Sequence, residues 1–96
     1  MATYQVLYWQ EIPSQVDARD GSKSHKEILS QRFQELIDLV ATRRNLVESE
    51  AYISGWSKGE KNERAGTAAE VARSVAAELE GQYDRIRADA LRKSTP

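Results

Sequence analysis

The sequence contains no cysteine, and this absence excludes several kinds of chemistry. Without thiols the chain has no disulfides, no cysteine ligands for zinc or iron–sulfur clusters, and no thiol nucleophile. A small secreted domain without disulfides would be unusual, so we expect a cytoplasmic protein. No apolar run approaches the roughly 18 residues of a membrane span, and the N-terminus lacks the pattern of a secretion signal. We therefore expect no membrane association.

A charge excess of either sign is also missing. Fourteen Lys and Arg residues face fifteen Asp and Glu residues, which leaves a net charge of −1. No overall field then attracts nucleic acid, although Arg43, Arg44, Lys58 and Lys61 could form a local basic set. We expect no nucleic-acid partner. The 96 residues suffice for one domain, in which residues 93–96 should fray.

The residues that catalysis and metal binding need are scarce. His25 is the only histidine and lies in a segment that resembles the first turn of a helix, where the helix dipole disfavours a charged imidazole. The segment before Gly21 fails the spacing of a calcium loop, and Gly59 to Thr67 fails that of a phosphate-binding loop. We predict no catalytic residues, no metal site and no cofactor.

The hydrophobic pattern predicts an α+β domain in the order β-β-α-β-α. Residues 3–9 are β-branched and aromatic, and residues 15–19 alternate, so each predicts a strand. Between them Ile12-Pro13 indicates a turn, and Asp20-Gly21 indicates a second turn. We expect a small, largely antiparallel sheet of three or so strands, with two amphipathic helices packed on one face.

Each of the two helices opens with a capping-box pattern. Ser24-His-Lys-Glu27 predicts the start of the first helix, and Thr67-Ala-Ala-Glu70 that of the second. Apolar stripes at the helical period follow both boxes, and Ile28 widens the stripe of the first. Arg43-Arg44-Asn45 is typical of a helix end, and Gly81 allows a bend in the second helix. Residues 46–66 are less regular, and we predict a short strand around Tyr52 to Trp56.

Two groups of residues are candidates for binding. Aromatic residues gather in the predicted strands, where they either pack in the core or form a recognition surface at Tyr8, Trp9 and Trp56. The second candidate is an anion site at the start of the second helix. There the free N–H groups behind Thr67 face a loop that carries Lys58 and Arg64, although a solvated loop explains the same residues.

Five motifs carry a resemblance to a known family. They are Tyr4-Gln-Val-Leu-Tyr-Trp9, Ile12-Pro-Ser-Gln-Val16, Leu29-x-x-Arg32-Phe33-Gln34-x-x-Ile37-Asp38, Tyr52-x-x-Gly55-Trp56 and Gly66-Thr67-Ala68-x-Glu70-Val71-Ala72. Together they resemble the small bacterial virulence-factor domain proteins, whose domain is similar to a segment of the larger conserved virulence factor C proteins. The resemblance implies a bacterial, cytoplasmic protein with an accessory role linked to corrinoid- and folate-dependent one-carbon metabolism. It brings no catalytic residues with it.

These observations predict a non-enzymatic accessory or protein-interaction domain. A partner protein, or a second copy in a homodimer, would bind an aromatic-bearing face or an edge of the sheet. The alternative function is the binding of a small anion or cofactor at Lys58, Arg64 and Thr67.

Overall fold

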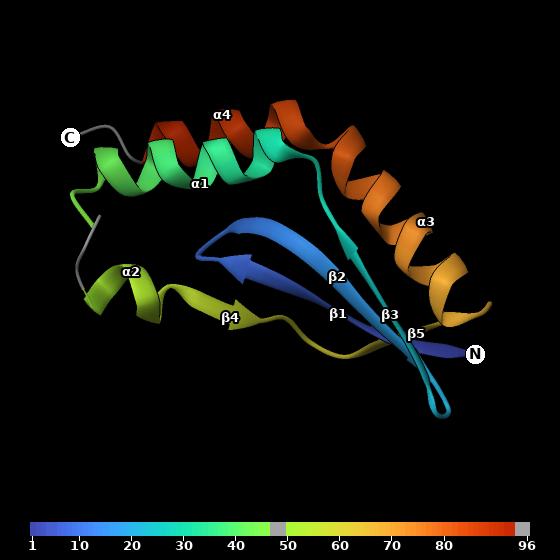
Figure 1. The fold of residues 1–96 in the computed structure, drawn as a ribbon. Coiled ribbons are helices and arrows are strands. Elements are labelled where there is room, and N and C mark those ends of the chain that lie inside the picture. The colour runs from blue at the N-terminus through green and yellow to red at the C-terminus, as the bar shows by residue number, and fades with distance from the viewer. Residues whose placement is uncertain (47–49, 94–96) are drawn as a thin grey trace.

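The computed structural model describes residues 1–46 and 50–93 and shows an α+β fold (Figure 1). One antiparallel sheet has the strand order β3-β2-β1-β4, and β5 also pairs with β1. The elements are β1 (Ala2–Trp9), β2 (Ile12–Asp20), β3 (Lys23–Ile28), α1 (Gln31–Arg43), α2 (Glu50–Ser54), β4 (Trp56–Lys58), β5 (Asn62–Arg64), α3 (Ala68–Gly81) and α4 (Tyr83–Lys93). The predicted class is confirmed, but the predicted strand count and element order are wrong.

The first two strands form the predicted hairpin. β1 and β2 pair along their length, and Gln10 turns the chain with a φ of 53°. The turn predicted at Pro13 is wrong, because Pro13 lies inside β2 and pairs with Tyr8 beside an irregularity in the register. An irregularity of this kind is one of the few places where a strand tolerates a residue without an N–H group.

Residues 23–28 form a strand where the sequence predicts the first turn of a helix. The predicted turn at Gly21 is confirmed, with a φ of 62°, and it sends the chain back along β2. The capping box of Ser24 and Glu27 is therefore absent, and His25 lies in β3 with its Nε2 2.9 Å from a carboxylate oxygen of Glu27. Pairing along a whole strand satisfies more backbone groups than one capped turn, so the long-range ladder prevails.

The apolar stripe of the first helix is confirmed, although α1 begins only at Gln31. The buried residues of α1 are Phe33, Leu36, Ile37, Val40 and Ala41. Ile28, which the pattern assigns to the same stripe, belongs to β3 instead and is 71% exposed. Asn45 follows the helix with a φ of 58°, as expected for a residue that tolerates a left-handed conformation.

Residues 50–64 form one helix and two strands, so the prediction of a single short strand is wrong. Tyr52 lies in the helix α2, and Trp56 begins the strand β4. Gly55 separates them, and a Cβ atom there would lie 2.8 Å from the indole nitrogen of Trp9. The close approach of Trp9 therefore requires glycine at this position, where the chain leaves the helix and enters the sheet.

The second predicted helix is divided into α3 and α4. Its capping box is confirmed, because Thr67 accepts a hydrogen bond from the backbone of Glu70 and the Glu70 carboxylate accepts one from the backbone of Thr67. The helix is interrupted after Gly81, and α4 then runs beside α1 (Figure 1). In the described part of the chain, a Cβ atom added at Gly81 would meet no neighbouring atom within 4 Å, so close packing does not cause the break.

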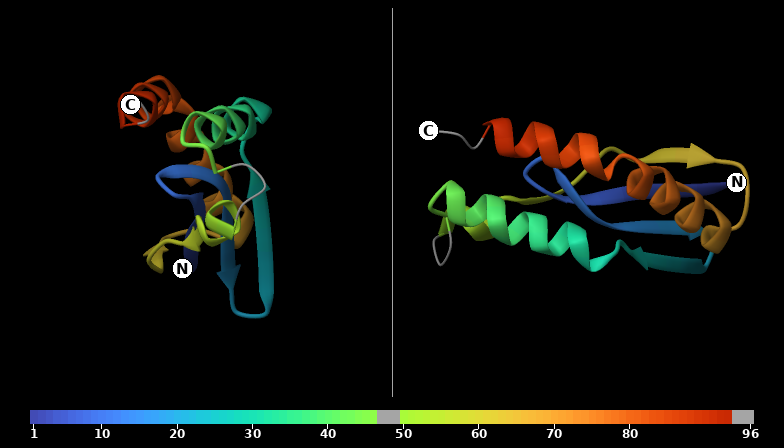
Figure 2. Two further views of the ribbon diagram at one scale, coloured as in Figure 1. Left: turned by 90° about the vertical axis from the view of Figure 1, so that its left-hand side faces the viewer. Right: turned by 90° about the horizontal axis from the view of Figure 1, so that it is seen from above.

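The helices α1, α3 and α4 lie on one side of the sheet, while α2 lies beside β4 (Figures 1 and 2). The prediction of two helices on one face is thus corrected to three. Between the layers is one apolar core, whose largest buried side chains are Trp9, Phe33, Ile12, Leu36, Ile37, Val16, Val40 and Val71. From Ala2 to Val6 in β1 and from Val16 to Ala18 in β2, residues that lie in or against the core alternate with residues that point to the other side of the sheet. Beyond the register irregularity this alternation stops, and Trp9, Ile12 and Pro13 are all buried.

Candidate functional site

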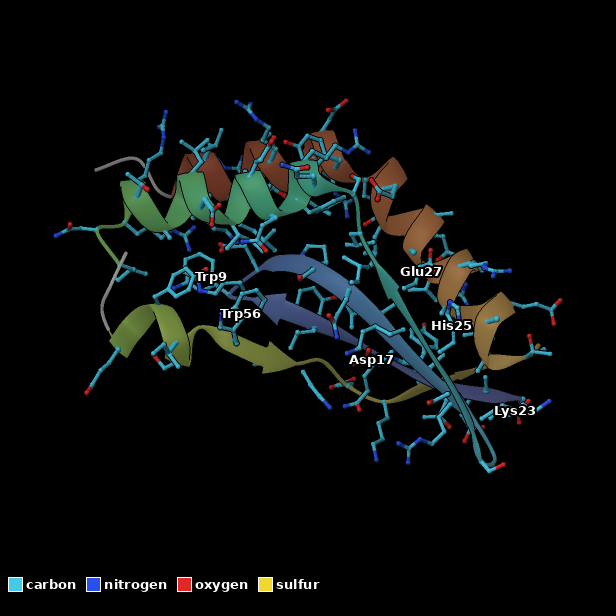
Figure 3. The ribbon with its side chains drawn as sticks, in the orientation of Figure 1. Trp9, Asp17, Lys23, His25, Glu27 and Trp56 are labelled. Atoms are coloured by element: carbon cyan, nitrogen blue, oxygen red, sulfur yellow. The ribbon has the colours of Figure 1, made fainter. Side chains whose placement is uncertain are left out.

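Trp9, one of the residues predicted for an interaction surface, lies in the core. Its exposed fraction is 0%, and its indole N–H donates to the backbone carbonyl of Tyr52 over 2.8 Å. The two rings are tilted against each other with their centroids 5.5 Å apart. Figure 3 shows Trp9 at the end of the sheet near α2. Trp9 therefore holds α2 against β1, and a partner cannot touch it in this conformation.

Tyr8 and Trp56 are partly buried and lie close to the same cluster. The Trp56 ring stands edge-on to Tyr52, with 6.5 Å between the centroids. Tyr8 lies against Gly59, where a Cβ atom would come within 3.0 Å of its ring. Part of each ring remains accessible to solvent, so contact of Tyr8 and Trp56 with a partner stays a prediction.

The predicted anion site does not assemble around Arg64. Arg64 donates to the Glu78 carboxylate over 2.6 Å and to the Ser74 hydroxyl over 3.2 Å, and its guanidinium lies over the ring of Tyr4. The hydrogen bond from Arg64 holds the pKa of the Glu78 carboxyl below its ordinary value. Arg64 therefore already has an anionic partner within the chain, on α3.

The N-terminus of α3 already has a carboxylate as well. The Thr67 N–H donates to Glu70 over 3.1 Å, and this bond lowers the pKa of the Glu70 carboxyl. Lys58 lies elsewhere, because it pairs with Leu7 and points to the opposite side of the sheet from Arg64, which pairs with the buried Ala2. Lys58, Arg64 and Thr67 therefore do not converge on one ligand.

The side of the sheet away from α1, α3 and α4 carries a different set of side chains, and we call it the open face. Because opposite residues in an antiparallel ladder point to the same side, these side chains form rows across the strands. The first row is Lys58, Leu7, Gln15 and Ile28; the second is Gln5, Asp17 and Lys26; the third is Glu63, Thr3, Arg19 and Ser24. Every residue in these rows is partly or fully exposed.

Four cations surround the open face: Arg19, Lys26, Lys58 and Lys61. Two carboxylates, Asp17 and Glu63, lie among them. Within residues 1–46 and 50–93, none of the four cations forms an ion pair with a carboxylate. This holds even for Lys26, which lies directly opposite Asp17 in the ladder. The open face therefore presents an excess of positive charge that the described part of the chain does not neutralise.

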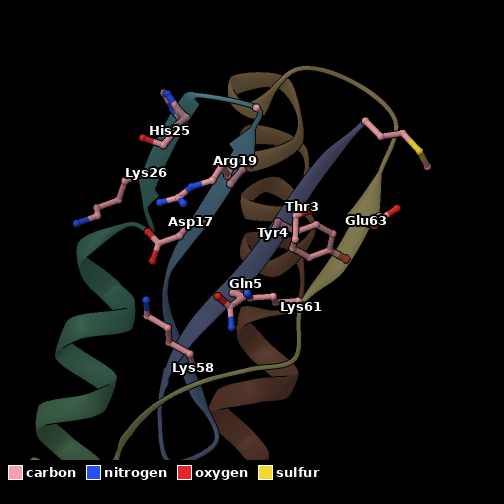
Figure 4. A pocket seen from close by; sticks show the side chains of 14 residues that line it. Thr3, Tyr4, Gln5, Asp17, Arg19, His25, Lys26, Lys58, Lys61 and Glu63 are labelled. Atoms are coloured by element: carbon pink, nitrogen blue, oxygen red, sulfur yellow. The ribbon is translucent and has the colours of Figure 1, made fainter.

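The second and third rows line a shallow hollow with a volume of about 780 Å³ (Figure 4). Gln5 lies on its floor and donates from its side-chain amide to the carbonyl of Gly59 over 3.0 Å. This bond fixes the connection from β4 to β5, which brings Lys61 to the rim. A hollow of this size fits a small ligand or several side chains of a partner. Its lining offers four cations and the side-chain amide of Gln5 for binding.

Sequence reasoning missed Arg19 and Lys26 as binding candidates. The alternation that could have identified the open face is present at residues 15–19, where Gln15, Asp17 and Arg19 alternate with two apolar residues, whereas residues 24–27 are all polar. Since the capping-box pattern predicts a helix over residues 24–28, it does not place their side chains beside those of β2. Of the six predicted binding residues, only Lys58 lies in the open-face rows, and Trp56 lies on the same side of β4 as Lys58.

In residues 1–46 and 50–93, no group of three His, Asp or Glu side chains is arranged to hold a metal ion. No helix in the same part of the chain is long and apolar enough to cross a membrane.

Comparison with known proteins gives one match. A family model described as "Virulence factor" matches residues 7–91, which is most of the chain. No curated protein and no solved structure matches the chain. The matched region includes most of the open face, from Leu7 through β2 and β3 to Glu63.

Proposed function

The chain belongs to the virulence factor family, and from this starting point we propose that it is a non-catalytic domain that binds another protein through the open face of its sheet. The observation that carries the proposal is a set of four cations, Arg19, Lys26, Lys58 and Lys61, around a hollow; within residues 1–46 and 50–93 they have no ion-pair partner and no helix covers the hollow. Protein surfaces that bind partners combine charge of one sign with a few accessible apolar side chains.

The open face also offers the apolar part of such a surface. Ile28 ends the first row and is 71% exposed, and Leu7 lies two strands away in the same row. Trp56 continues this surface on β4, and tryptophan is among the residues that most often contribute strongly to binding. Ile28 and Trp56 lie on the two outer strands of the sheet, β3 and β4, with Leu7 on β1 between them.

The proposed setting is an accessory role in a bacterial cytoplasmic pathway, and one-carbon metabolism with corrinoids and folates is the setting that the family resemblance suggests. An accessory domain without catalytic residues would act there by binding an enzyme of the pathway. Immunoprecipitation of a tagged chain, followed by mass spectrometry, would identify such enzymes. Recovery of partners unrelated to corrinoids and folates would contradict this setting but leave the binding function in place.

The second candidate function is the binding of a small anion. The cations around the hollow favour it, whereas the start of α3, where Thr67 and Arg64 are already bonded, does not. A bound ligand at 100 times its dissociation constant would add about 2.7 kcal/mol to the stability. Thermal unfolding in a panel of phosphate, citrate and tetrahydrofolate tests this candidate, and an unchanged melting temperature would count against it.

Site-specific cross-linking tests the binding function directly. A photoreactive amino acid is placed in the intact protein at Ser24, on the open face, or at Ala77, an exposed residue of α3. Both residues are small, so the fold should tolerate either change. In living source cells, Ser24 should form a cross-link to a defined protein, and Ala77 should not. Equal labelling from both positions, or none from Ser24, would contradict the proposal.

A further inference from the structure

We propose that the partner presents an acidic amphipathic helix, which lies on the open face with its carboxylates at the cations and its apolar side chains at Ile28, Leu7 and Trp56. This inference rests on the proposed binding function and names the chemistry of the partner. It follows from the charge of the open face, from the arrangement of its rows, and from the space that the rows leave.

Charge complementarity selects an acidic occupant. The open face has four cations and two carboxylates, whereas the whole chain has a net charge of −1. On the other side of the sheet, Arg32, Arg44 and Arg64 are each bonded to a carboxylate. An acidic partner would break no such ion pair on the open face, so its attraction to Arg19, Lys26, Lys58 and Lys61 is not offset by a lost contact.

The arrangement of the rows selects an amphipathic occupant. The first row places Lys58 and Ile28 at its two ends with Leu7 between them, and the next rows are polar. A ligand that complements this surface has apolar groups along one line and carboxylates beside it. A helix with a leucine stripe flanked by glutamates has this pattern, because residues three and four apart lie on the same face.

The dimensions also suit a helix. Neighbouring strands lie about 4.8 Å apart, so the first row spans roughly 14 Å across its four strands. A helix that lies along the row rises about 1.5 Å per residue, so roughly ten residues span it. Helices pack readily on sheets, and a partner helix would complete a third layer opposite α1, α3 and α4.

Other occupants fit the surface less well. Asp17 and Glu63 lie among the cations of the open face and would repel the phosphate backbone of a nucleic acid. A second copy has no acidic helix to offer among the described residues. On α4, the cations Arg85, Arg87, Arg92 and Lys93 outnumber two aspartates, and on α3 the carboxylates of Glu78 and Glu80 are bonded to arginines.

The test is a titration of the isotope-labelled full chain with a synthetic peptide, followed by amide chemical shifts and calorimetry. The peptide has roughly 18 residues, enough for a stable helix, with a leucine stripe flanked by glutamates. A matched peptide carries lysine in place of each glutamate. We expect saturable shifts at Thr3, Asp17 and Lys26 with the glutamate peptide only, and weaker binding at high salt.

Matched variants locate the site. Arg19→Glu combined with Lys58→Glu should weaken binding by about tenfold or more, whereas Arg85→Glu combined with Arg87→Glu should change it by less than about twofold. Ile28→Ser should weaken binding, whereas Ile53→Ser, at an equally exposed residue on α2, should not. Circular dichroism and thermal unfolding verify that each variant is folded.

Several results would overturn the inference. They are the absence of saturable shifts at millimolar peptide, equal binding of the lysine peptide, or shifts confined to α4. Tighter binding of inorganic phosphate or of a single-stranded RNA at the same residues would assign the open face to those ligands. Shifts that depend on the concentration of the protein alone would assign it to a second copy. A cross-link from Ser24 to a partner without an acidic helix would reject this inference but leave the proposed function intact.

Discussion

The two sides of the sheet use their cations in different ways. On the side that the helices cover, Arg32, Arg44 and Arg64 bond to Glu80, Glu11 and Glu78, which lie 48, 33 and 14 residues away in the chain. On the open face, no cation is paired within the described part of the chain. The comparison separates arginines that join secondary-structure elements from cations that remain accessible to a ligand.

The contact of Glu80 shows how the covered side is held together. Ser30, the residue before α1, has no side-chain cap of its own, but its N–H and hydroxyl donate to the carboxylate of Glu80 at 2.7 and 2.8 Å. Arg32 donates to the same carboxylate and lies 4.3 Å from the centre of the Tyr83 ring. Glu80 from α3 thus caps α1, directly before the break between α3 and α4.

Arg44 joins three other parts of the fold. It donates to both carboxylate oxygens of Glu11 at 2.8 and 3.0 Å, to the side chain of Gln10, and to the carbonyl of Ala90. The turn between β1 and β2 is thereby tied to the end of α1 and to α4. Burial raises the pKa of the Glu11 carboxyl, but the hydrogen bonds and positive charge of Arg44 outweigh this effect and lower it.

The largest expected difference between the two sides is in the free energy of unfolding that is lost when an isoleucine is replaced by alanine. Ile37 is 0% exposed beneath α1, so Ile37→Ala should lower the free energy of unfolding by about 2–5 kcal/mol through lost burial and a cavity. Ile28→Ala on the open face should change it by less than about 0.5 kcal/mol. Urea unfolding followed by circular dichroism measures both. A loss at Ile28 as large as that at Ile37 would show that the open face is buried in solution.

Acid should weaken the covered side. Ser30 and Arg32 lower the pKa of Glu80 despite partial burial, as Arg44 lowers that of Glu11. Each carboxylate therefore stabilises the fold fully above its unfolded pKa of about 4.3, and this contribution is lost as the pH falls through the lower folded value. We expect the urea concentration at the midpoint of unfolding, measured between pH 6 and pH 2.5, to decrease once the pH is below about 4.3. A double variant, Glu11→Gln with Glu80→Gln, should show a smaller fall, and an equal fall would contradict this account.

Glu80→Gln alone should lower the free energy of unfolding by about 1–2 kcal/mol at pH 7, because the cap of α1 and the ion pair with Arg32 are both weakened. Glu35→Gln on the exposed side of α1 is the matched control and should be close to neutral. Thermal unfolding of the two variants gives the comparison. If they are equally stable, the contact between α3 and α1 does not contribute to stability.

The smallest expected effects on stability lie on the open face. Arg19→Ala and Lys58→Ala should each change the free energy of unfolding by less than about 0.5 kcal/mol, since neither cation has an ion-pair partner to lose in the described residues. Arg44→Ala, by contrast, removes the contacts to Glu11 and should lower the free energy of unfolding by more than either of these two variants. Equal losses at Arg19 and Arg44 would remove the distinction between the two sides.

Local sequence signals predicted the parts of the fold that depend on neighbouring residues. The apolar stripe of α1, the capping box at Thr67 and the turn at Gly21 are present as predicted. Each depends on contacts within about four residues along the chain, so composition and spacing are sufficient to identify it.

The errors occur where long-range pairing competes with a local signal. Ser24 and Glu27 have the residue types of a capping box, yet they lie in β3 because β2 offers a complete ladder of hydrogen bonds. The same error concealed the open face, since Lys26 cannot be placed beside Asp17 without knowing that β3 exists. The predicted aromatic surface failed at Trp9 for a related reason, because only the fold brings Tyr52 onto it.

The sequence by itself determined an α+β domain without thiols, with the stripe of α1 and the cap of α3, because those properties depend on composition and on short-range periodicity. Only the tertiary structure decided that Arg64 is bonded to Glu78, that Glu80 caps α1, and that Lys58 lies on the same side of the sheet as Arg19. These relations depend on strand register and helix packing. A shift of one residue in a strand would exchange the two sides of the sheet, and the uniformly polar residues 23–27 of β3 do not specify that choice.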